Sequence, residues 1–299
     1  MADTVIIETD ELRKQYDGVD ALQGLTLRVP KASIFGFLGR NGAGKTTTIK
    51  ILMGMAHAAS GRARVFGLDV NGGDSGVAIR QRAAFVSEDK ALYDSMSVDD
   101  MVRFTAAFFP RWRKDLEARY LAKFDLPAGR RIKALSGGMR TKLALLLALC
   151  RGAELLVLDE PTSSLDPAVS EEVLQTLVAH VASEELTVFF SSHQLAEVDQ
   201  IADHVAIVHH GRTVVDGALD DLREQYRRIQ IVFDRPAPES SWRTPGVVRT
   251  RRDGRVLSLF VSGNADRVVD EARSLNPTSV DVIPVTLKEI FLETVGTED

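Results

Sequence analysis

The sequence contains a single cysteine, Cys150, among its 299 residues, so no disulfide can form within the chain. Cys150 ends the apolar run Leu143–Cys150, and we interpret it as a small residue in the core of a buried helix rather than as a reactive thiol. Such sparing use of cysteine is consistent with a reducing cytoplasm.

Long apolar segments are missing as well. The leucine-rich run at residues 143–150 is the longest one, far short of the ~20 residues of a membrane-spanning helix, so we expect that the chain does not cross a membrane by itself. Residues 1–5 lack the basic and apolar regions of a signal peptide. The formal net charge is −5, which argues against a general nucleic-acid-binding protein.

Up to about residue 226 the sequence alternates β-branched strands with amphipathic helices. Near-continuous apolar strands such as Leu155–Leu158 are typical of a parallel sheet covered on both faces. Between residues 97 and 149 the pattern becomes almost entirely helical, which indicates a helical insertion into an α/β core. We predict strands at residues 5–8, 25–29, 33–38, 84–87, 155–158, 187–191 and 205–209.

The pattern changes after Arg228, where the turn-rich connector 234–241 begins a second region. Asp253-Gly254 is a strong hairpin signal between two strands. We predict strands at 247–251, 255–261 and 280–283, and helices at 266–275 and 287–295. The expected domains are therefore an α/β domain at 1–227, with a helical subdomain at about 90–150, and a small α+β domain at 228–299.

Residues 39–47 fit the pattern G-x-x-x-x-G-K-[ST], which wraps nucleotide phosphates. An apolar strand precedes them and a helix is expected to begin at Lys45, so backbone N–H groups and the positive helix end would face the anion. Lys45 would reach the β- and γ-phosphates, and the Thr46 hydroxyl would bind Mg²⁺. The predicted phosphate-binding residues are Gly39, Asn41, Gly42, Ala43, Gly44, Lys45, Thr46 and Thr47.

Two carboxylates, Asp159 and Glu160, end the apolar strand at 155–158. Burial of a carboxylate is costly unless a metal or a donor compensates it. We predict that Asp159 holds the Mg²⁺ carried by ATP and that Glu160 polarises a water for attack on the γ-phosphate. An acidic pair after a strand means little alone, but downstream of a phosphate loop it favours ATP hydrolysis.

Leu135-Ser136-Gly137-Gly138 opens the most apolar helix of the chain. Ser136 is a good N-cap, and Gly137 and Gly138 expose backbone N–H groups at a positive helix end. These features describe a second anion site that has no lysine of its own. Taken alone, a capped helix start is the simpler interpretation.

The chain contains three motifs in a fixed order: a phosphate loop, then the sequence Leu-Ser-Gly-Gly, then an apolar strand that ends in Asp-Glu. In this order the motifs resemble those of the ATP-binding subunits of ABC transporters. Residues 161–167 and 191–193 continue the match, which covers roughly residues 4–226. Residues 86–90, 139–147 and 286–292 are similar to the branch that serves ABC-2-type exporters. The resemblance implies a P-loop NTPase fold with a mostly parallel sheet, antiparallel strands near the N-terminus and a helical subdomain.

The resemblance also implies how the motifs act together. In this family two nucleotide-binding domains pair head to tail, so the motif at Ser136 would contact the γ-phosphate bound to the partner chain. Asp166 would lie at the dimer seam, and His193 would contact the γ-phosphate and orient the attacking water. Tyr16 matches the aromatic residue that stacks on adenine.

The partners implied by the resemblance are a second ATP-binding subunit, identical or related, and a separate multi-span membrane permease. The chain would then act at the cytoplasmic face of the cell membrane as a peripheral MgATP-hydrolysing subunit, with no nucleic acid expected. In the helical insertion, part of a set of five aromatic residues and one methionine, which we call the aromatic set, would receive helices of the permease. Phe104 and Phe108 fit the insertion's own core equally well. The set comprises Tyr93, Met96, Phe104, Phe108, Phe109 and Trp112.

Three positions depart from the family pattern. Glu88 stands where glutamine is usual, which keeps an oxygen ligand for Mg²⁺ but adds negative charge beside the phosphates. Ser164 stands where glycine is common, and we expect it to stiffen the loop at the dimer seam. Arg40 stands where proline is common, and we favour an exposed, solvated arginine there.

Two alternative classes remain open at this point. One is a soluble ABC ATPase of translation or DNA repair, but the chain has neither a second motif set nor long coiled-coil heptads. The other is an ATP-gated regulatory module that acts through protein contacts. Robust ATP turnover without a membrane partner would favour the regulatory module.

Overall fold

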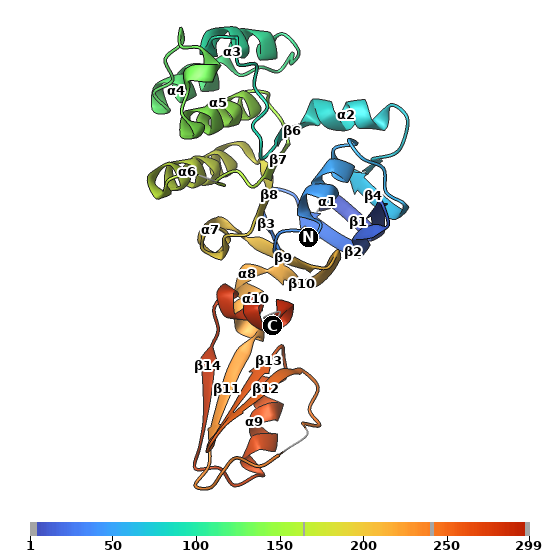
Figure 1. Cartoon of the computed structure of the whole chain (residues 1–299), viewed down its shortest axis with the longest axis vertical. Helices are drawn as coiled ribbons and strands as arrows, with labels where there is room; N and C mark the ends of the chain where they lie inside the picture. Colours follow the sequence, from blue (N-terminus) through green and yellow to red (C-terminus); the bar gives the residue numbers. More distant parts are fainter. Residues whose placement is uncertain (1–4, 164, 240–241, 297–299) are drawn as a thin grey trace. The chain divides into compact units, whose positions relative to one another are not determined.

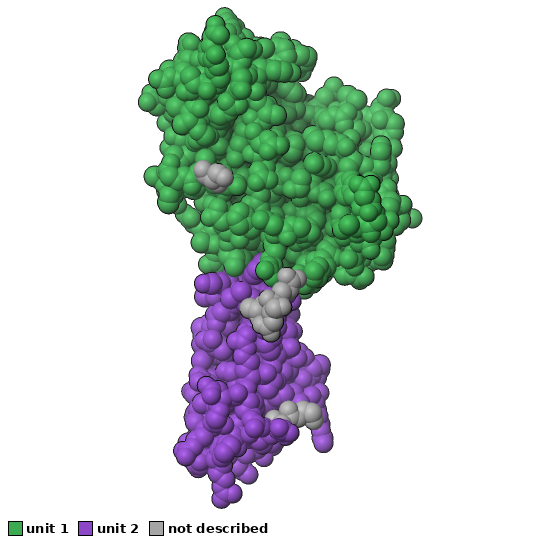
Figure 2. Space-filling model, viewed as in Figure 1, with its two compact units in different colours: residues 1–216 green, residues 217–299 purple. Residues whose placement is uncertain are grey.

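The computed structural model describes residues 5–163, 165–239 and 242–296. The chain divides into two compact units, Met1–Asp216 and Gly217–Asp299, which we call unit 1 and unit 2 (Figure 2). This division precedes the expected boundary at residues 227 and 228. The reason is local, because Gln225 donates a hydrogen bond to the Ser262 carbonyl and Tyr226 packs on Phe260 inside unit 2.

Unit 1 contains an antiparallel sheet in the order β2-β1-β4-β5. Its strands are β1 (Val5–Tyr16), β2 (Val19–Pro30), β4 (Ser60–Val65) and β5 (Leu68–Asp69). The predicted strands at 5–8 and 25–29 cover only the apolar parts of the long β1–β2 hairpin. The prediction missed β4 because only Ala63 and Val65 of this strand are buried, so its alternation is short.

A second sheet of unit 1 has the order β10-β9-β3-β8-β7-β6, and β9, β3, β8, β7 and β6 pair in parallel. The predicted mostly parallel sheet is confirmed. Its loops at the carboxyl ends of β3, β7 and β8 meet at one edge, where α/β sheets bind ligands. The strands are β3 (Ile34–Leu38), β6 (Ala83–Val86), β7 (Leu155–Asp159), β8 (Thr187–Ser192), β9 (His204–His209) and β10 (Arg212–Ala218).

Helices cover both sheets of unit 1 (Figure 1). The predicted helical insertion contains α3, α4, a 3₁₀ turn (Ile132–Ala134) and α5, and Ser97 caps α3 by accepting a hydrogen bond from the Asp100 N–H. The helices are α1 (Lys45–Leu52), α2 (Ser75–Arg82), α3 (Val98–Ala106), α4 (Lys114–Lys123), α5 (Gly137–Leu149), α6 (Pro167–Glu184) and α7 (Leu195–Ile201).

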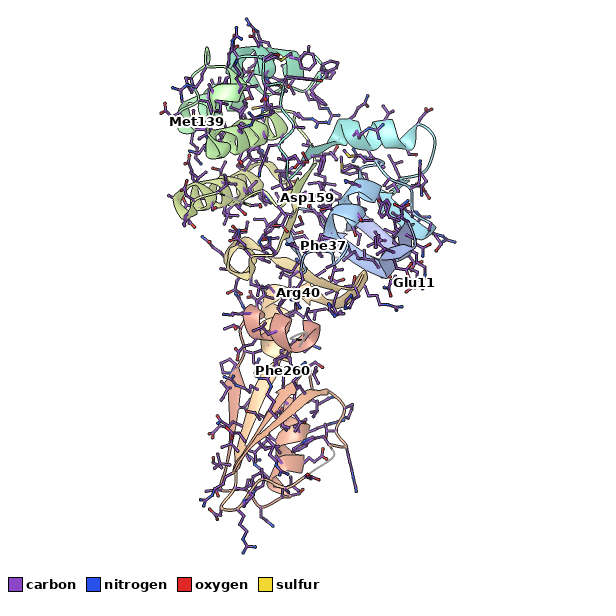
Figure 3. The ribbon with its side chains drawn as sticks, viewed as in Figure 1. Glu11, Phe37, Arg40, Met139, Asp159 and Phe260 are labelled. Atoms are coloured by element: carbon purple, nitrogen blue, oxygen red, sulfur yellow. The ribbon has the colours of Figure 1, made fainter. Side chains whose placement is uncertain are left out.

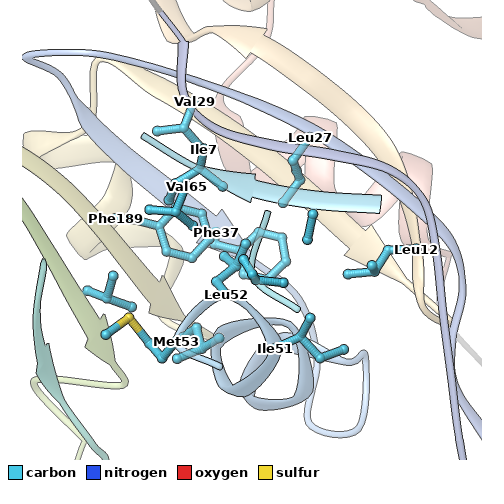
Figure 4. Close-up of a cluster of buried hydrophobic side chains, with 14 of the residues drawn as sticks. Ile7, Leu12, Leu27, Val29, Phe37, Ile51, Leu52, Met53, Val65 and Phe189 are labelled. Carbon is cyan, nitrogen blue, oxygen red and sulfur yellow. The ribbon is translucent and has the colours of Figure 1, made fainter. Parts of the chain in front are cut away.

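The main core of unit 1 lies between α1 and the two sheets (Figure 4). Phe37 of β3 and Phe189 of β8 are fully buried, with ring centroids 5.1 Å apart. Ile51 and Leu52 of α1 and Leu27 of β2 close the cluster from the other sides. This packing fixes the start of α1 at the carboxyl edge of the parallel sheet.

Unit 2 has an antiparallel sheet in the order β12-β13-β11-β14, with α9 against it. The turn predicted at Asp253-Gly254 joins β12 to β13, and the central strand β11 was not predicted because its apolar residues alternate with Arg228 and Gln230. The elements are α8 (Leu219–Gln225), β11 (Arg227–Val232), β12 (Val247–Asp253), β13 (Val256–Val261), α9 (Ala265–Arg273), β14 (Ser279–Pro284) and α10 (Leu287–Val295).

The close approach of α7 to β3 yields the first testable prediction. A Cβ at Gly36 would lie 2.3 Å from Cγ1 of Val198, well inside van der Waals contact. We expect Gly36→Ala to destabilise the chain by about 1–3 kcal/mol through overpacking. Calorimetric melting should show a lower Tm, whereas the matched variant Gly129→Ala, whose added Cβ meets no atom within 4 Å, should melt like the parent. Equal melting of both variants would contradict this packing.

Candidate functional site

The glycine-rich loop connects β3 to α1, and α1 begins at Lys45 as predicted. Gly44 adopts a left-handed φ of 105°, and a Cβ there would lie 2.7 Å from the Ala21 carbonyl oxygen and from Leu22 Cδ2. Only glycine fits this position, which lets the loop turn against the β1–β2 hairpin. The Gly44 carbonyl then accepts hydrogen bonds from the N–H and the hydroxyl of Thr48.

A cavity of about 620 Å³ opens around this loop, and we call it the nucleotide cavity. This volume is in the usual range for small-molecule sites. Its walls come from the β1–β2 hairpin, the glycine-rich loop, the start of α1, and the segments that follow β6, β7 and β8. The lining residues are Val19, Asp20, Ala21, Arg40, Asn41, Gly42, Gly44, Lys45, Thr46, Thr47, Glu88, Glu160, Ser163 and His193.

Lys45 is almost completely buried and is held by the protein itself. Its Nζ donates to the Gly39 carbonyl at 2.7 Å and lies 3.1 Å from Oε1 of Glu160. The second contact is an ion pair rather than a directed hydrogen bond, because Oε1 of Glu160 has no hydrogen-bond partner among the described residues. The positive charge of Lys45 is therefore balanced by the carboxylate of Glu160.

Glu160 follows β7 and lies between two basic groups. Its Oε1 faces Lys45, and its Oε2 is 2.8 Å from Nδ1 of His193. The Ser191 hydroxyl accepts a hydrogen bond from the Glu160 N–H and donates one to Oδ1 of Asp159. Ser191 therefore connects the ends of β7 and β8, because it holds the carboxylate of Asp159 and the backbone of Glu160. No local sequence pattern indicated this role for Ser191.

A buried polar network supports the segment that carries His193. Oε2 of Glu197 accepts hydrogen bonds from the hydroxyls of Thr162 and Ser192, at 2.6 and 3.2 Å. The Ser192 hydroxyl in turn accepts one from the Gln194 N–H. Burial raises the pKa of the Glu197 carboxyl, although its hydrogen bonds oppose this. The network holds the chain on both sides of His193, so the ring is positioned toward Glu160.

The oxygen donors of the cavity suit a magnesium ion that arrives with phosphates. The described residues contain no group of three or more His, Cys, Asp or Glu side chains that could hold a metal ion by themselves. Thr46 and Glu88 line the nucleotide cavity, and Asp159 lies buried at the end of β7. Mg²⁺ is commonly bound by one or two carboxylates together with substrate phosphates and waters, which fits this sparse set.

Three predicted residues near the loop do not line the nucleotide cavity directly. Gly39 contributes its carbonyl to Lys45, and Ala43 is buried beneath the loop. Tyr16 is 43% exposed at the end of β1, with the Lys14 ammonium 4.7 Å from its ring centroid. Its strand partner Val19 does line the cavity, so the hairpin that carries Tyr16 reaches the site.

The second predicted anion site is separate from the nucleotide cavity. Ser136 caps α5 by accepting a hydrogen bond from the Met139 N–H, and neither Ser136, Gly137 nor Gly138 lines the cavity. Figure 3 places Met139 well away from Asp159 within unit 1.

Asp166, predicted at the dimer seam, is likewise absent from the lining of the nucleotide cavity. Its carboxylate caps α6 by accepting a hydrogen bond from the Val169 N–H at 3.0 Å. Ser164, the position where glycine is common, lies outside the described residues. The dimer-seam roles of both residues stay predictions.

Comparison with known proteins identifies the family. Residues 22–163 match the family model "ABC transporter", and residues 128–199 match "AAA domain, putative AbiEii toxin, Type IV TA system". The daunorubicin resistance ATP-binding protein DrrA3 of Streptomyces coeruleorubidus is 32% identical over 99% of this chain and 97% of its own length. The chain belongs to the ABC transporter ATP-binding proteins.

Two further relatives agree with this assignment. The bacitracin transport ATP-binding protein BcrA of Bacillus licheniformis is 32% identical over 75% of this chain and 74% of its own length. A solved structure described as the ATP-binding subunit of an ABC transporter is 27% identical, has a TM-score of 0.66, and covers 74% of this chain and 93% of that one. Both are ATP-binding proteins of transporters, the class that the motifs of this chain resemble.

Among the described residues, every helix is too short or too polar to cross a bilayer.

Proposed function

We propose that this chain hydrolyses MgATP with Glu160 as general base and thereby powers a membrane exporter built from separate membrane-spanning subunits. The observation that carries this proposal is the position of Glu160, whose two oxygens lie 3.1 Å from Lys45 Nζ and 2.8 Å from His193 Nδ1 at the wall of the nucleotide cavity. A base held between a phosphate-binding lysine and a histidine is suited to activate water.

In the proposed cycle the γ-phosphate of ATP replaces the carboxylate of Glu160 as the ionic partner of Lys45. The freed carboxylate accepts a proton from a water that attacks the γ-phosphorus, while the bond from that phosphorus to the oxygen of ADP breaks. His193 keeps the water and Glu160 aligned. Mg²⁺, when bound by Thr46, Asp159 and Glu88 together with the phosphates, would neutralise developing negative charge on the phosphate oxygens.

The separation of the two anion sites supports a head-to-tail dimer, with an identical or a related chain. Within one chain, Ser136, Gly137 and Gly138 do not contribute to the nucleotide cavity. A Cβ built on Gly137 meets no atom within 4 Å, so the helix start is open to an approaching group. A second chain that brings its bound ATP to this helix end would complete both sites, and hydrolysis would release the pair.

A second cavity supports our proposal that a membrane subunit binds to this chain, and we call it the docking cavity. It has a volume of about 320 Å³ and lies between β6, α3 and α5. The segment after β6 serves both cavities, because Glu88 lines the nucleotide cavity and Ser87 and Lys90 line the docking cavity. The lining residues are Phe85, Val86, Ser87, Lys90, Ala91, Leu92, Met101, Thr105, Ala144, Leu147, Ala148 and Arg151.

Part of the predicted aromatic set is exposed next to this cavity. Tyr93, Phe104 and Phe108 are 57%, 39% and 64% exposed, and their rings touch edge to face at 5.6 and 5.2 Å. Phe109 and Trp112 instead contact groups of their own unit, namely the guanidinium of Arg151 and the carboxylate of Glu117. An exposed aromatic cluster beside an apolar cavity is a typical protein-binding surface.

Export as the direction of transport, and the cytoplasmic face of the cell membrane as the location, are proposed from the relatives. The names of DrrA3 and BcrA refer to daunorubicin resistance and to bacitracin transport. Both fit removal of a toxic compound from the cell by a permease that such a subunit energises. The compound would be recognised by the permease rather than by this chain.

The decisive experiment is affinity purification of the tagged full-length chain from detergent-solubilised membranes, followed by mass spectrometry. We expect a multi-span membrane protein in stoichiometric amount, and faster ATP turnover in that complex than in the isolated chain. If the chain is absent from membranes and turns over ATP equally well alone, transport is contradicted, and the ATPase acts as a regulatory module through protein contacts.

A further inference from the structure

The docking cavity has an unusual charge for an otherwise apolar site. Phe85, Leu92, Met101 and Leu147 supply apolar walls, and the charged side chains in its lining are Lys90 and Arg151 alone, both cations. Buried or partly buried cations are normally paired with a carboxylate, since transfer of an unpaired charge out of water is costly.

Arg151 follows α5 and has incomplete hydrogen bonding. One Nη donates to the Arg80 carbonyl at 2.7 Å, and the guanidinium carbon lies 3.7 Å from the ring centroid of Phe109. Its Nε is buried and has no hydrogen-bond partner among the described residues. Burial alone lowers the pKa of Arg151 to about 10, with no carboxylate opposing the effect.

Lys90 approaches the same cavity from the segment after β6. Its backbone is left-handed, with φ of 44°, and its N–H donates to the Ser87 carbonyl at 3.0 Å, which closes a tight turn. Burial is the largest cause of its lowered pKa, which Glu88, Asp89 and Glu160 oppose at longer range. In the described part of the chain, no carboxylate lies within ion-pair distance of the ammonium.

Neighbouring arginines of the helical region behave differently. Arg140 forms a salt bridge of 2.7 Å with Asp94, and Arg103 bridges to Asp100 at 2.7 Å on the exposed side of α3. Arg140 and Arg103 thus have acidic partners, whereas Lys90 and Arg151 have none among the described residues. A carboxylate partner for these two cations would therefore come from another chain.

We propose that the docking cavity binds a helical segment of the membrane subunit through one acidic side chain, whose carboxylate pairs with the guanidinium of Arg151 and the ammonium of Lys90. This inference rests on the proposed transport function and adds to it the chemistry of the partner. Apolar residues on the same helical face would pack against Met101 and Leu147 and beside the exposed ring of Phe104, as in other helix-in-groove interfaces. A carboxylate that is both paired and shielded in this way supplies specificity as well as affinity.

The test compares Arg151→Gln and Lys90→Gln with the matched control Arg103→Gln in the full-length tagged chain, co-expressed with the membrane subunit that the wild-type chain retains. We expect each cavity variant to retain at least about tenfold less membrane subunit than the wild-type chain. The reason is that the carboxylate of the membrane subunit would stay buried with one of its two cations removed. Arg103→Gln should retain the wild-type amount. ATP binding by isolated Arg151→Gln should be normal, which shows that the variant is folded.

The acidic partner is then located directly. A photo-crosslinking p-benzoylphenylalanine in place of Thr105 should capture one cytoplasmic segment of the membrane subunit, and that segment should carry Asp or Glu. Neutralising this carboxylate should reproduce the loss seen with Arg151→Gln. A charge swap should restore binding: Arg151→Glu in this chain, combined with arginine in place of the acidic residue of the membrane subunit.

The outcomes distinguish failure of the transport proposal from failure of the acidic contact. If the wild-type chain retains no membrane subunit, the transport proposal and the acidic contact both fail. If it does, but both cavity variants retain as much as Arg103→Gln, or if the captured segment has no essential carboxylate, then the acidic contact alone is wrong. In a last outcome, acetate abolishes the difference in retained membrane subunit between the wild-type chain and the cavity variants, and no segment is crosslinked. This result would indicate that the cavity binds a small free anion, and it would also overturn the proposal.

Discussion

Replacing Glu160 by glutamine is expected to lower ATP turnover by about 10²–10⁴-fold, the usual contribution of a positioned general base. Glutamine has nearly the same shape but cannot take a proton from water. The hydrogen bond between Ser191 and the Glu160 N–H does not involve the side chain, so the turn after β7 should persist. Single-turnover hydrolysis with radiolabelled ATP measures the effect.

The same variant should still bind ATP and should accumulate as an ATP-bound dimer. Glutamine removes the negative charge that faces Lys45 at 3.1 Å, so the lysine is freely available for the γ-phosphate. Light scattering after gel filtration with MgATP would show the dimer. The matched control is Glu185→Gln, the same change at an exposed carboxylate at the end of α6, which should behave like the parent. Wild-type turnover in Glu160→Gln would refute the general-base assignment.

Local signals explain why much of the nucleotide cavity could be predicted from sequence. The residues from Gly39 to Thr47 are contiguous, and the strand before them and the helix after them are strongly apolar on one face. Glu160 was identifiable because a buried strand ends beside it. In each case the chemistry lies within a few residues of a pattern with a clear physical reason.

Contacts between distant segments could not be predicted in this way. Ser191 fixes Asp159 and Glu160 from the neighbouring strand β8, and nothing in the local sequence distinguishes it from an ordinary strand serine. The tip of the β1–β2 hairpin enters the cavity at Asp20 only because the glycine-rich loop packs against it. Such residues become visible once the strand order is known.

The segment after β6, which contains Glu88 and Lys90, shows the same limit of sequence-based prediction. Glu88 departs from the glutamine that is usual in the family, and the sequence predicts only an added negative charge near the phosphates. The structure adds that Lys90, two residues later, belongs to the docking cavity and is close enough to Glu160 to be affected by its charge. One short segment thus contacts both cavities with opposite charges, which suits the transmission of partner binding to the ATP site.

The variant Lys45→Ala is expected to lose most of its nucleotide affinity. Truncating one partner of a buried, hydrogen-bonded charge pair costs about 2–5 kcal/mol, which corresponds to roughly 30-fold or more in Kd. Titration with a fluorescent ATP analogue measures the change. Lys50→Ala, an exposed lysine in the last turn of the same helix, is the matched control and should bind like the parent.

Lys45 also neutralises Glu160, so its removal should lower stability as well as affinity. Glu160 would remain buried with His193 as its nearest basic group, and breaking a buried pair typically costs about 3–5 kcal/mol. The double variant Lys45→Ala/Glu160→Gln separates the two effects, because it has neither charge of the pair. We expect its Tm to recover toward that of the parent while ATP affinity stays low. If the Tm and the ATP affinity both recover in the double variant, Lys45 affects nucleotide binding only by stabilising the fold. Unchanged ATP binding in Lys45→Ala would contradict the phosphate-loop assignment itself.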